Sequence, residues 1–243
     1  NMMVHGIEVP SNILNDNTLA RPLRDYGKKD QVDVIVTNPP FGGVEEDGIE
    51  NNFPAEFRTR ETADLFLVLV MELLKDGGRA AIVLPDGTLF GEGIKTRIKK
   101  KMLEECNLHT IVRLPKSVFA PYTSIATNVL FLTKGEPTKD IWYYEHQLPE
   151  GVKAYNKTKP MRLSEFDEEK KWWNKRKDTE KAWKVSAKDI AANNYNLDVK
   201  NPNAPVEIHE DPEALLAQYA EAVKAAKALQ DQLKVSLQQS LGN

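Results

Sequence analysis

Cysteine is nearly absent from this chain of 243 residues, since Cys106 is its only one. A single thiol cannot form an internal disulfide, which favours a reducing compartment, so we expect a cytoplasmic protein. Cys106 lies near the predicted end of a helix, and we expect it to be an ordinary helical residue.

Long apolar runs are missing as well. A membrane-spanning helix needs about 18 uninterrupted apolar residues, and no segment approaches that length. The overall apolar content of 41% is still ample for a hydrophobic core. These features predict a globular protein without a membrane partner.

The chain also lacks an excess of positive charge. Its 33 Lys and Arg residues face 36 Asp and Glu residues, which gives a net charge of −3. A protein that grips nucleic acid alone normally neutralises phosphates with clustered basic residues. Such binding would therefore need basic residues gathered on one face, or a partner subunit that makes many of the contacts.

The most informative motif that is present joins a buried strand to a rigid turn. The nearly all-apolar run 32–36 predicts a strand of a parallel sheet, and Asn38, Pro39, Pro40 and Phe41 follow it. In α/β proteins, ligands bind at the carboxyl ends of such strands. The Asn38 amide offers an acceptor oxygen, the prolines stiffen the turn, and Phe41 offers a flat face. This set suits a planar ring with an amino group, although a merely rigid turn could carry the same tripeptide.

Helix and strand patterns alternate after this motif. The expected helices and strands occupy 62–75 (helix, ended by Asp76-Gly77-Gly78), 79–84 (strand), 93–105 (helix), 110–114 (strand) and 128–132 (strand). The last two strands have no obvious helix between them, so we expect them to pair antiparallel. This order predicts an α/β fold with a largely parallel sheet.

The composition changes after residue 134. Within segment 135–205, residues 164–189 are dense in charges of both signs, with Trp172, Trp173 and Trp183 interleaved. Because these charges largely cancel, we expect a solvated surface with the tryptophans packed inward, rather than a nucleic-acid or subunit contact.

Residues 206–243 contain the clearest helix. Asp211 fits the N-cap, Pro212 fits the first helical position, and apolar residues recur every three or four positions as far as Leu241. Such a helix would be about 45 Å long. Its narrow apolar stripe suits either a partner helix or the chain's own core. The chain is therefore expected to divide into segments 1–134, 135–205 and 206–243.

Six segments in one order resemble the modification subunits of type I restriction-modification systems. They are 1–7, 15–19, 37–42, 77–87, 114–119 and 127–132, and Tyr195–Asp198 resembles the element that follows the catalytic domain in those subunits. The resemblance implies a Rossmann-like class I methyltransferase sheet, here only its later strands with an antiparallel last strand, followed by a helical C-terminal extension. It also implies methyl transfer from S-adenosylmethionine to the exocyclic amino group of adenine in DNA.

The resemblance places the catalytic motif at Asn38, Pro39, Pro40 and Phe41. It implies that Asn38 and the Pro39 carbonyl hold the target amino group, while Phe41 stacks on a flipped-out base. Accepting both amino hydrogens exposes the nitrogen lone pair, so catalysis would depend on positioning and electrostatics, without a covalent intermediate or a metal.

Two further assignments follow from the resemblance. Asn17, with Asp16 beside it, matches the residue near the adenine of the cofactor, where many relatives have Asp. Tyr122, in the loop 120–127, is the candidate for a second wall beside the base.

The resemblance also implies partners. These are DNA, a specificity subunit that reads the sequence, a second copy of the modification subunit, and a restriction subunit with nuclease and translocase activity. A separate DNA-reading subunit would account for the mildly acidic charge of this chain.

Relatives that have this motif order begin with a Gly-rich cofactor loop, which is followed by an acidic residue that binds the ribose. We find neither feature here. In their sheet, the first strand lies beside the strand that ends at Asn38, so we expect an open sheet edge there. We expect these residues to be the carboxyl-terminal portion of a longer subunit, inactive by themselves.

Two other interpretations stay open. Asn-Pro-Pro followed by Phe or Tyr also occurs in methyltransferases that act on guanine in RNA or on glutamine in proteins. Those enzymes tend to stop soon after the last strand, whereas this chain continues to residue 243. The final helix could alternatively serve a non-catalytic assembly scaffold.

Overall fold

The structure, a computed structural model, describes residues 3–6, 13, 15–204 and 212–241. The chain divides into two compact units, Asn1–Ala204 and Pro205–Asn243. The strands of the first unit are β1 (Val32–Thr37), β2 (Leu74–Pro85), β3 (Cys106–Arg113), β4 (Thr127–Lys134), β5 (Asp140–Glu145) and β6 (Ala182–Ser186). Its α-helices are α1 (Thr62–Leu73), α2 (Asp86–Phe90), α3 (Ile94–Glu105), α4 (Asp167–Trp173) and α5 (Ala187–Ala192).

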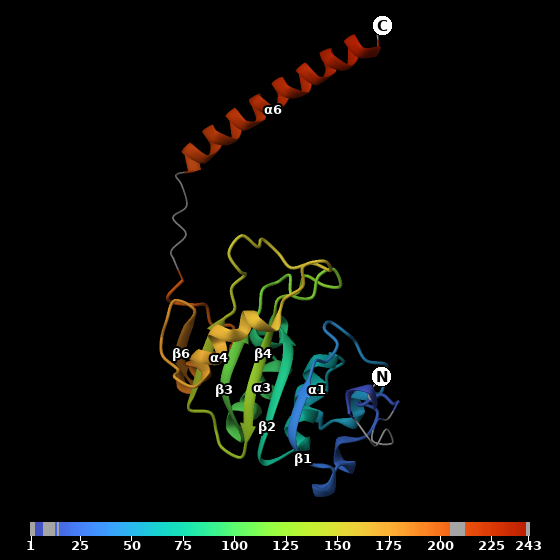
Figure 1. The fold of residues 1–243 in the computed structure, drawn as a ribbon. Helices are drawn as coiled ribbons and strands as arrows, with labels where there is room; N and C mark the ends of the chain where they lie inside the picture. Colours follow the sequence, from blue (N-terminus) through green and yellow to red (C-terminus); the bar gives the residue numbers. More distant parts are fainter. Residues whose placement is uncertain (1–2, 7–12, 14, 205–211, 242–243) are drawn as a thin grey trace. The chain divides into compact units, whose positions relative to one another are not determined.

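The six strands form one sheet in the order β1-β2-β4-β3-β5-β6 (Figure 1). Strands β1, β2, β3 and β5 run in one direction, and β4 and β6 run antiparallel to their neighbours. This is the predicted α/β fold, and the predicted antiparallel pairing of β3 with β4 is confirmed. Segment 135–205 adds β5 and β6 to the same sheet.

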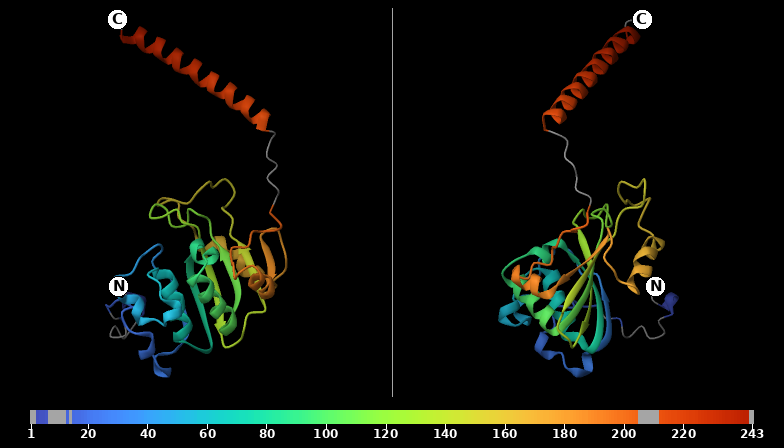
Figure 2. Two further views of the ribbon diagram at one scale, coloured as in Figure 1. Left: turned by 180° about the vertical axis from the view of Figure 1, so that it is seen from behind. Right: turned by 90° about the vertical axis from the view of Figure 1, so that its left-hand side faces the viewer.

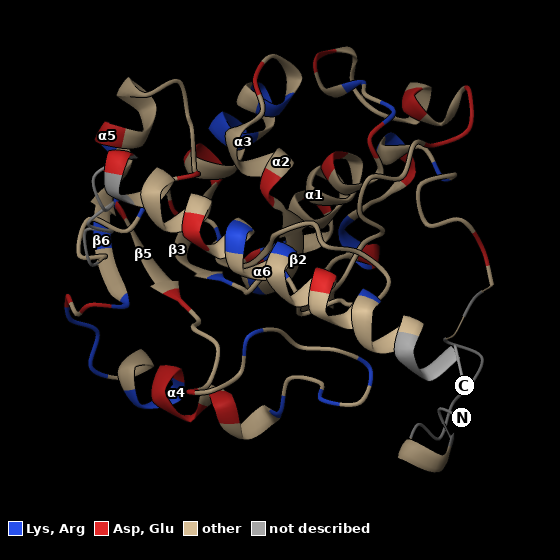
Figure 3. Cartoon of the chain, turned by 90° about the horizontal axis from the view of Figure 1, so that it is seen from above, with Lys and Arg blue, Asp and Glu red and all other residues tan. Residues whose placement is uncertain are grey.

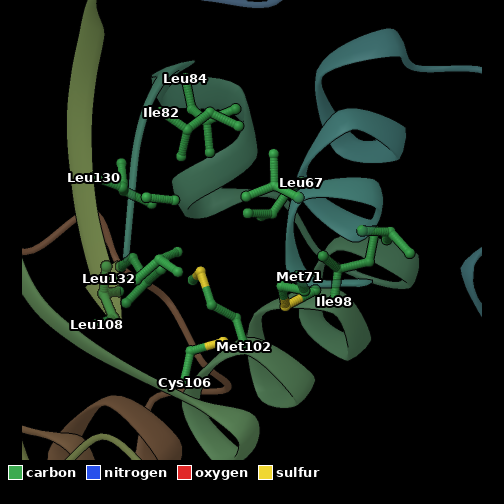
Figure 4. Packing of buried hydrophobic residues seen from close by; sticks show 14 of the residues in the cluster. Leu67, Met71, Ile82, Leu84, Ile98, Met102, Cys106, Leu108, Leu130 and Leu132 are labelled. Carbon is green, nitrogen blue, oxygen red and sulfur yellow. The ribbon is translucent and has the colours of Figure 1, made fainter. Parts of the chain in front are cut away.

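Helices cover the two faces of the sheet unequally. One face packs against α1 and α3, and α4 lies on the opposite face (Figure 2). The first interface contains side chains that alternate along the strands and meet the apolar sides of both helices (Figure 4). Its fully buried members include Leu67, Met71, Ile82, Met102, Leu108 and Leu130. Burying each of these side chains contributes about 1.5–3 kcal/mol, so this interface supplies much of the stability.

The tryptophans of the charged segment pack inward, as predicted. Trp172 and Trp183 are 8% and 2% exposed, and the Trp183 ring stacks on that of Tyr143 at 5.3 Å. Trp172 and its neighbours on α4 line an open apolar groove of about 570 Å³ against the sheet. Segment 135–205 is thus anchored by aromatic side chains, and most of its charged groups are exposed, with Glu169 buried against His146 as an exception.

Two expectations about element boundaries are wrong. Helix α1 ends at Leu73, and the segment expected to end the helix, Asp76–Gly78, lies within β2. The strand starts early because Leu74 pairs with Val32 of β1. Gly78 permits this local backbone path, since a Cβ there would lie 2.8 Å from the Lys75 carbonyl oxygen and 3.2 Å from the Val32 carbonyl oxygen.

Cys106 is the second correction, because it is the first residue of β3 and not a helical residue. Its thiol is fully buried beneath α3, and burial raises the pKa of the thiol to about 11. The protein therefore keeps this cysteine protonated and packed as a small apolar side chain.

Strand β1 forms an edge of the sheet. Within the described residues it pairs only with β2, and Val34 and Val36 are 53% and 80% exposed. An apolar strand with unpaired backbone groups is a template for another strand. The open edge that the sequence predicts beside Asn38 is therefore present in the described part of the chain.

The second unit contains α6 (Pro212–Leu241), an uninterrupted helix of 30 residues that agrees with the predicted one. Side chains of its apolar stripe are exposed, including Leu229 at 66% and Leu233 at 61%. Among the described residues, neither this helix nor any other has the length and apolarity to cross a bilayer.

The open edge yields a prediction about association. Replacing Val36 by Lys places a charge on the edge strand, and we expect self-association to weaken by about tenfold, or 1.4 kcal/mol. Sedimentation velocity over a concentration series measures this. Val44, an exposed loop residue, supplies the matched Val44→Lys control. Equal association of both variants and the parent chain would contradict a role for this edge.

Candidate active site

The Asn-Pro-Pro-Phe motif emerges from the carboxyl end of β1. The last residue of the strand, Thr37, pairs with Ile82, and the two prolines then end the ladder because they have no N–H to donate. Pro39 is buried, whereas the Asn38 side chain is exposed and makes no hydrogen bond with the described residues. The turn is therefore anchored by the buried Pro39, and it presents the Asn38 amide, whose oxygen is available to a ligand.

The Phe41 ring has an aromatic neighbour that the sequence assignment missed. It is half-buried and meets Phe119 edge-on, with ring centroids 5.2 Å apart and an angle of 66° between the planes. Phe119 lies in the loop that follows β3, within the segment 114–119 that carries part of the family resemblance. Tyr122, the predicted second wall, lies on the same loop and is 86% exposed.

A hydrogen-bonded chain connects the segment around Asn17 to the loop after Phe41. The Asn17 Oδ1 atom accepts from the Leu19 N–H at 2.9 Å, and its Nδ2 group donates to Glu45 at 3.3 Å. The second Glu45 oxygen accepts from the Thr62 hydroxyl at 2.7 Å. Leu19 is fully buried and anchors the segment. The structure thus brings the predicted cofactor segment and the loop after the predicted catalytic motif into contact through Glu45.

Gly43 allows this loop to approach the start of α1 closely. The Thr62 N–H donates to the Gly43 carbonyl at 3.1 Å. A Cβ atom at Gly43 would lie 2.8 Å from the Thr62 hydroxyl oxygen, which is closer than real Cβ contacts allow. A larger residue would therefore clash at this position, which lies two residues after Phe41.

A polar network that the sequence did not reveal lies at the same edge of the sheet. Asp86, the first residue after β2, accepts from the buried Asn128 amide at 2.6 Å. Arg113, at the end of β3, lies 2.6 Å from Asp198 and 3.9 Å from Asp86. Asp198 belongs to the segment that resembles the element after the catalytic domain. Its ion pair with Arg113 fixes that segment across the ends of the strands.

Helix α2 is held beside this edge by a buried lysine. The Lys99 amine donates to the carbonyl oxygens of Leu89 and Gly91, at 2.6 and 2.8 Å, and so caps the carboxyl end of α2. Its side chain is 1% exposed, and burial lowers the pKa of the amine to about 8. Lys99 thus anchors the carboxyl end of the short helix that Asp86 begins.

The buried carboxylate of Asp64 connects three helices at this place. It lies on α1, accepts from the Thr88 hydroxyl of α2 at 3.1 Å, and pairs with Lys95 of α3 at 2.6 Å. Burial raises the pKa of Asp64 despite the lysine beside it. The described residues contain no group of three or more His, Cys, Asp or Glu side chains arranged to hold a metal ion.

Comparison with known proteins relates the chain to a family of DNA methylases. The sequence pattern of the N-6 DNA methylase family matches residues 1–211. The type I restriction enzyme EcoEI methylase subunit of Escherichia coli is 60% identical over 241 residues, which cover 96% of this chain and 49% of that protein. The chain thus spans about half the length of the curated relatives it matches, 49% and 47% in two that it covers almost end to end.

Solved structures show the same fold. A chain from a structure on complex assembly of the type I R-M system superposes with a TM-score of 0.78 at 37% identity, covering 98% of this chain and 51% of that one. The type I restriction-modification system methyltransferase subunit from Streptococcus thermophilus superposes with a TM-score of 0.66 at 26% identity, covering 84% of this chain and 44% of that one.

The contact between Gly43 and Thr62 can be tested by a double-mutant cycle. We expect Gly43→Ala to lower the free energy of unfolding by about 1–3 kcal/mol, because the new methyl group overpacks against the hydroxyl. In a Thr62→Ala background the same change should cost much less, since the hydroxyl is gone. Urea denaturation of the four variants measures both values.

Gly87→Ala is the matched control, because a Cβ there would meet nothing within 4 Å. An equal cost of Gly43→Ala in both backgrounds would show that the Thr62 hydroxyl is not the obstacle.

Proposed function

The chain belongs to the N-6 DNA methylase family, and from this premise we propose that it contributes the target-base site of an adenine-specific DNA methyltransferase in a type I modification subunit. The observation that carries the proposal is the exposed Asn38 amide at the carboxyl end of β1, three residues before the half-buried Phe41 ring. The relatives described above are type I methylase subunits. This favours adenine in DNA over RNA guanine, protein glutamine or a purely structural role.

The chemistry follows from the acceptors in the turn. The amino nitrogen of adenine is a weak nucleophile because its lone pair is conjugated with the ring. In the proposed mechanism the Asn38 Oδ1 atom and the Pro39 carbonyl each accept one amino hydrogen, which favours a pyramidal nitrogen with an exposed lone pair. Both acceptors belong to one rigid turn, so the nitrogen is oriented without a covalent intermediate.

Phe41 and Phe119 would receive the base. Flipping an adenine out of a duplex costs a few kcal/mol, and stacking on Phe41 offsets part of this cost. The edge-on Phe119 ring, 5.2 Å away, braces Phe41 from the side. Tyr122 is exposed on the same loop and remains our candidate for the second wall.

S-adenosylmethionine supplies an electrophilic methyl group when it is bound. Asp16 and Asn17 are both exposed, and a carboxylate there fits hydrogen bonding to the amino group of the cofactor's adenine. The Asn17 amide is engaged with Leu19 and Glu45, whereas Asp16 accepts from the Asn17 N–H through Oδ1 and keeps a second carboxylate oxygen, which makes it the better acceptor of the two.

We further propose the assembly that the resemblance implies. Segments 1–134 and 135–205 would form the catalytic domain and its extension, and segment 206–243 would pack against other subunits through α6. The partners would be DNA, a specificity subunit, a second modification subunit and a restriction subunit. The single buried Cys106 thiol accords with a cytoplasmic location.

Asn38→Ala tests the proposed chemistry. In a complex of the modification subunit that carries this sequence with its specificity subunit, we expect transfer of labelled methyl groups to DNA to fall by about 10²- to 10³-fold, because one acceptor is lost. Binding of DNA and of S-adenosylmethionine should change little.

Asn174→Ala, at an exposed asparagine after α4, is the control and should transfer normally. Label on protein or RNA would favour the other methyltransferase classes. An Asn38→Ala complex as active as the parent would remove the proposed role of the motif.

Helix α6 can be tested with a matched pair of substitutions. Leu233 lies on the apolar stripe, and Val235 lies two residues on, about 200° round the helix. They are 61% and 53% exposed. We expect Leu233→Asp to weaken binding of the specificity subunit by about tenfold or more, as measured by calorimetry, and Val235→Asp to have little effect. Equal effects would contradict packing through the stripe.

A further inference from the structure

Two loops beside the candidate site project from the same edge of the sheet as Asn38. Loop 114–126 follows β3, and loop 146–162 follows β5. Strands β3 and β5 are parallel to each other and run in the same direction as β1. Their carboxyl ends therefore lie at the edge where the catalytic motif begins, and both loops rise there above the sheet (Figure 1).

The two loops are joined to each other and to the site. The backbone N–H of the buried Tyr155 donates to the Ser117 hydroxyl at 2.9 Å, and the Tyr155 hydroxyl donates to Glu165. Phe119, on the first loop, contacts Phe41. The loops thus form one surface with a defined position relative to the proposed target base.

The tip of the second loop is held by a local turn. The Asn156 Oδ1 atom accepts from the backbone N–H groups of Thr158 and Lys159, at 3.0 and 2.8 Å. Side chains on either side of this turn are therefore presented from an ordered backbone, so less conformational entropy is lost when they bind a ligand.

The charge of this surface is opposite to that of the chain. The two loops contain one acidic residue, Glu150, and five exposed basic residues that we call the basic platform: Lys116, Lys153, Lys157, Lys159 and Arg162. Among the described residues, no carboxylate oxygen lies within 4.0 Å of the charged nitrogen atoms of these five, so none of them forms an ion pair. Other basic residues, such as Lys95 and Lys181, are paired with carboxylates. Blue segments follow the loops next to α4 in Figure 3.

We propose that the basic platform binds the DNA phosphates that flank the flipped adenine. This inference rests on the proposed function, and it adds the surface by which the chain itself holds its substrate. Unpaired lysines at loop positions act as point charges on phosphates, without reading the base sequence. The platform therefore supplies affinity and position, and sequence reading is left to a partner. Gathering of basic residues on one face also explains how a chain with a net charge of −3 can bind DNA.

The test is the salt dependence of DNA binding. The full 243-residue chain is titrated against a fluorescein-labelled duplex containing one mismatched adenine, and anisotropy is followed between about 20 and 200 mM salt. We expect the triple variant Lys153→Gln, Lys157→Gln and Lys159→Gln to bind more weakly. The slope of log K against log salt should become shallower by about one per lysine, or about three in all.

A second triple variant provides a control of equal charge. Lys28, Lys29 and Lys139 are exposed and precede β1 and β5, so they lie at the amino-end edge of the sheet. Their replacement by Gln should leave the slope within error of the parent chain. Equal loss of slope in both triple variants would overturn the proposal, and so would absence of binding by the parent chain at 20 mM salt. Tighter binding of a matched RNA duplex or an acidic peptide would also overturn it.

Methyl transfer in the assembled complex separates this inference from the proposed function. If the parent complex methylates DNA but the platform variant keeps the salt slope of the parent chain, the inferred DNA contact of the basic platform is wrong and the proposed function stands. If no methyl transfer occurs while the slope still falls by about three, the platform binds DNA and the proposed chemistry is wrong.

Discussion

The parallel pairing of β1 with β2 is the constraint on which the site depends. The register from Val34–Arg79 to Thr37–Ile82 brings both strands to an end at the same edge. Asn38 and Asp86 therefore leave the sheet at the same edge, although β2 continues for three residues past Ile82 before Asp86 begins α2. Strands β3 and β5 are brought into the same direction by the antiparallel β4 between β2 and β3. Reversal of any one of these strands would send its loop to the opposite edge, away from the motif.

Polar groups at this edge divide into two sets. Those beneath it are held by hydrogen bonds within the chain, such as the Asn128 amide N–H group with Asp86 and the Lys99 amine with the end of α2. Those above it, including the Asn38 amide and the basic platform, are exposed and lack such partners among the described residues. A buried polar group without a partner would be costly, whereas an exposed one can exchange water for a ligand. The first set positions the turn, and the second set is available to a substrate.

Much of the fold could be predicted because the signals are local. Helix α3 begins within a residue of its predicted start, and α1 keeps its predicted start at Thr62, because apolar spacing determines both. The early start of β2 could not be predicted, since Gly77 and Gly78 look like a helix stop and only pairing with β1 makes them part of a strand. The place of β6 in the sheet could not be predicted for a similar reason. Its partner β5 lies about 40 residues earlier, and no local sequence pattern indicates a pairing that closes so long a loop.

The sequence by itself determined which functional groups the Asn38–Phe41 turn carries, the α/β class and the existence of the long final helix. Each of these follows from the properties of residues that are near neighbours in the chain. The tertiary structure decided which groups surround the turn. Phe119 against Phe41, Glu45 between Asn17 and Thr62, and the loops joined at Tyr155 all bring together residues far apart in sequence. Such contacts arise only when strand direction and register place their loops at one edge, and neither is encoded within a short window of sequence.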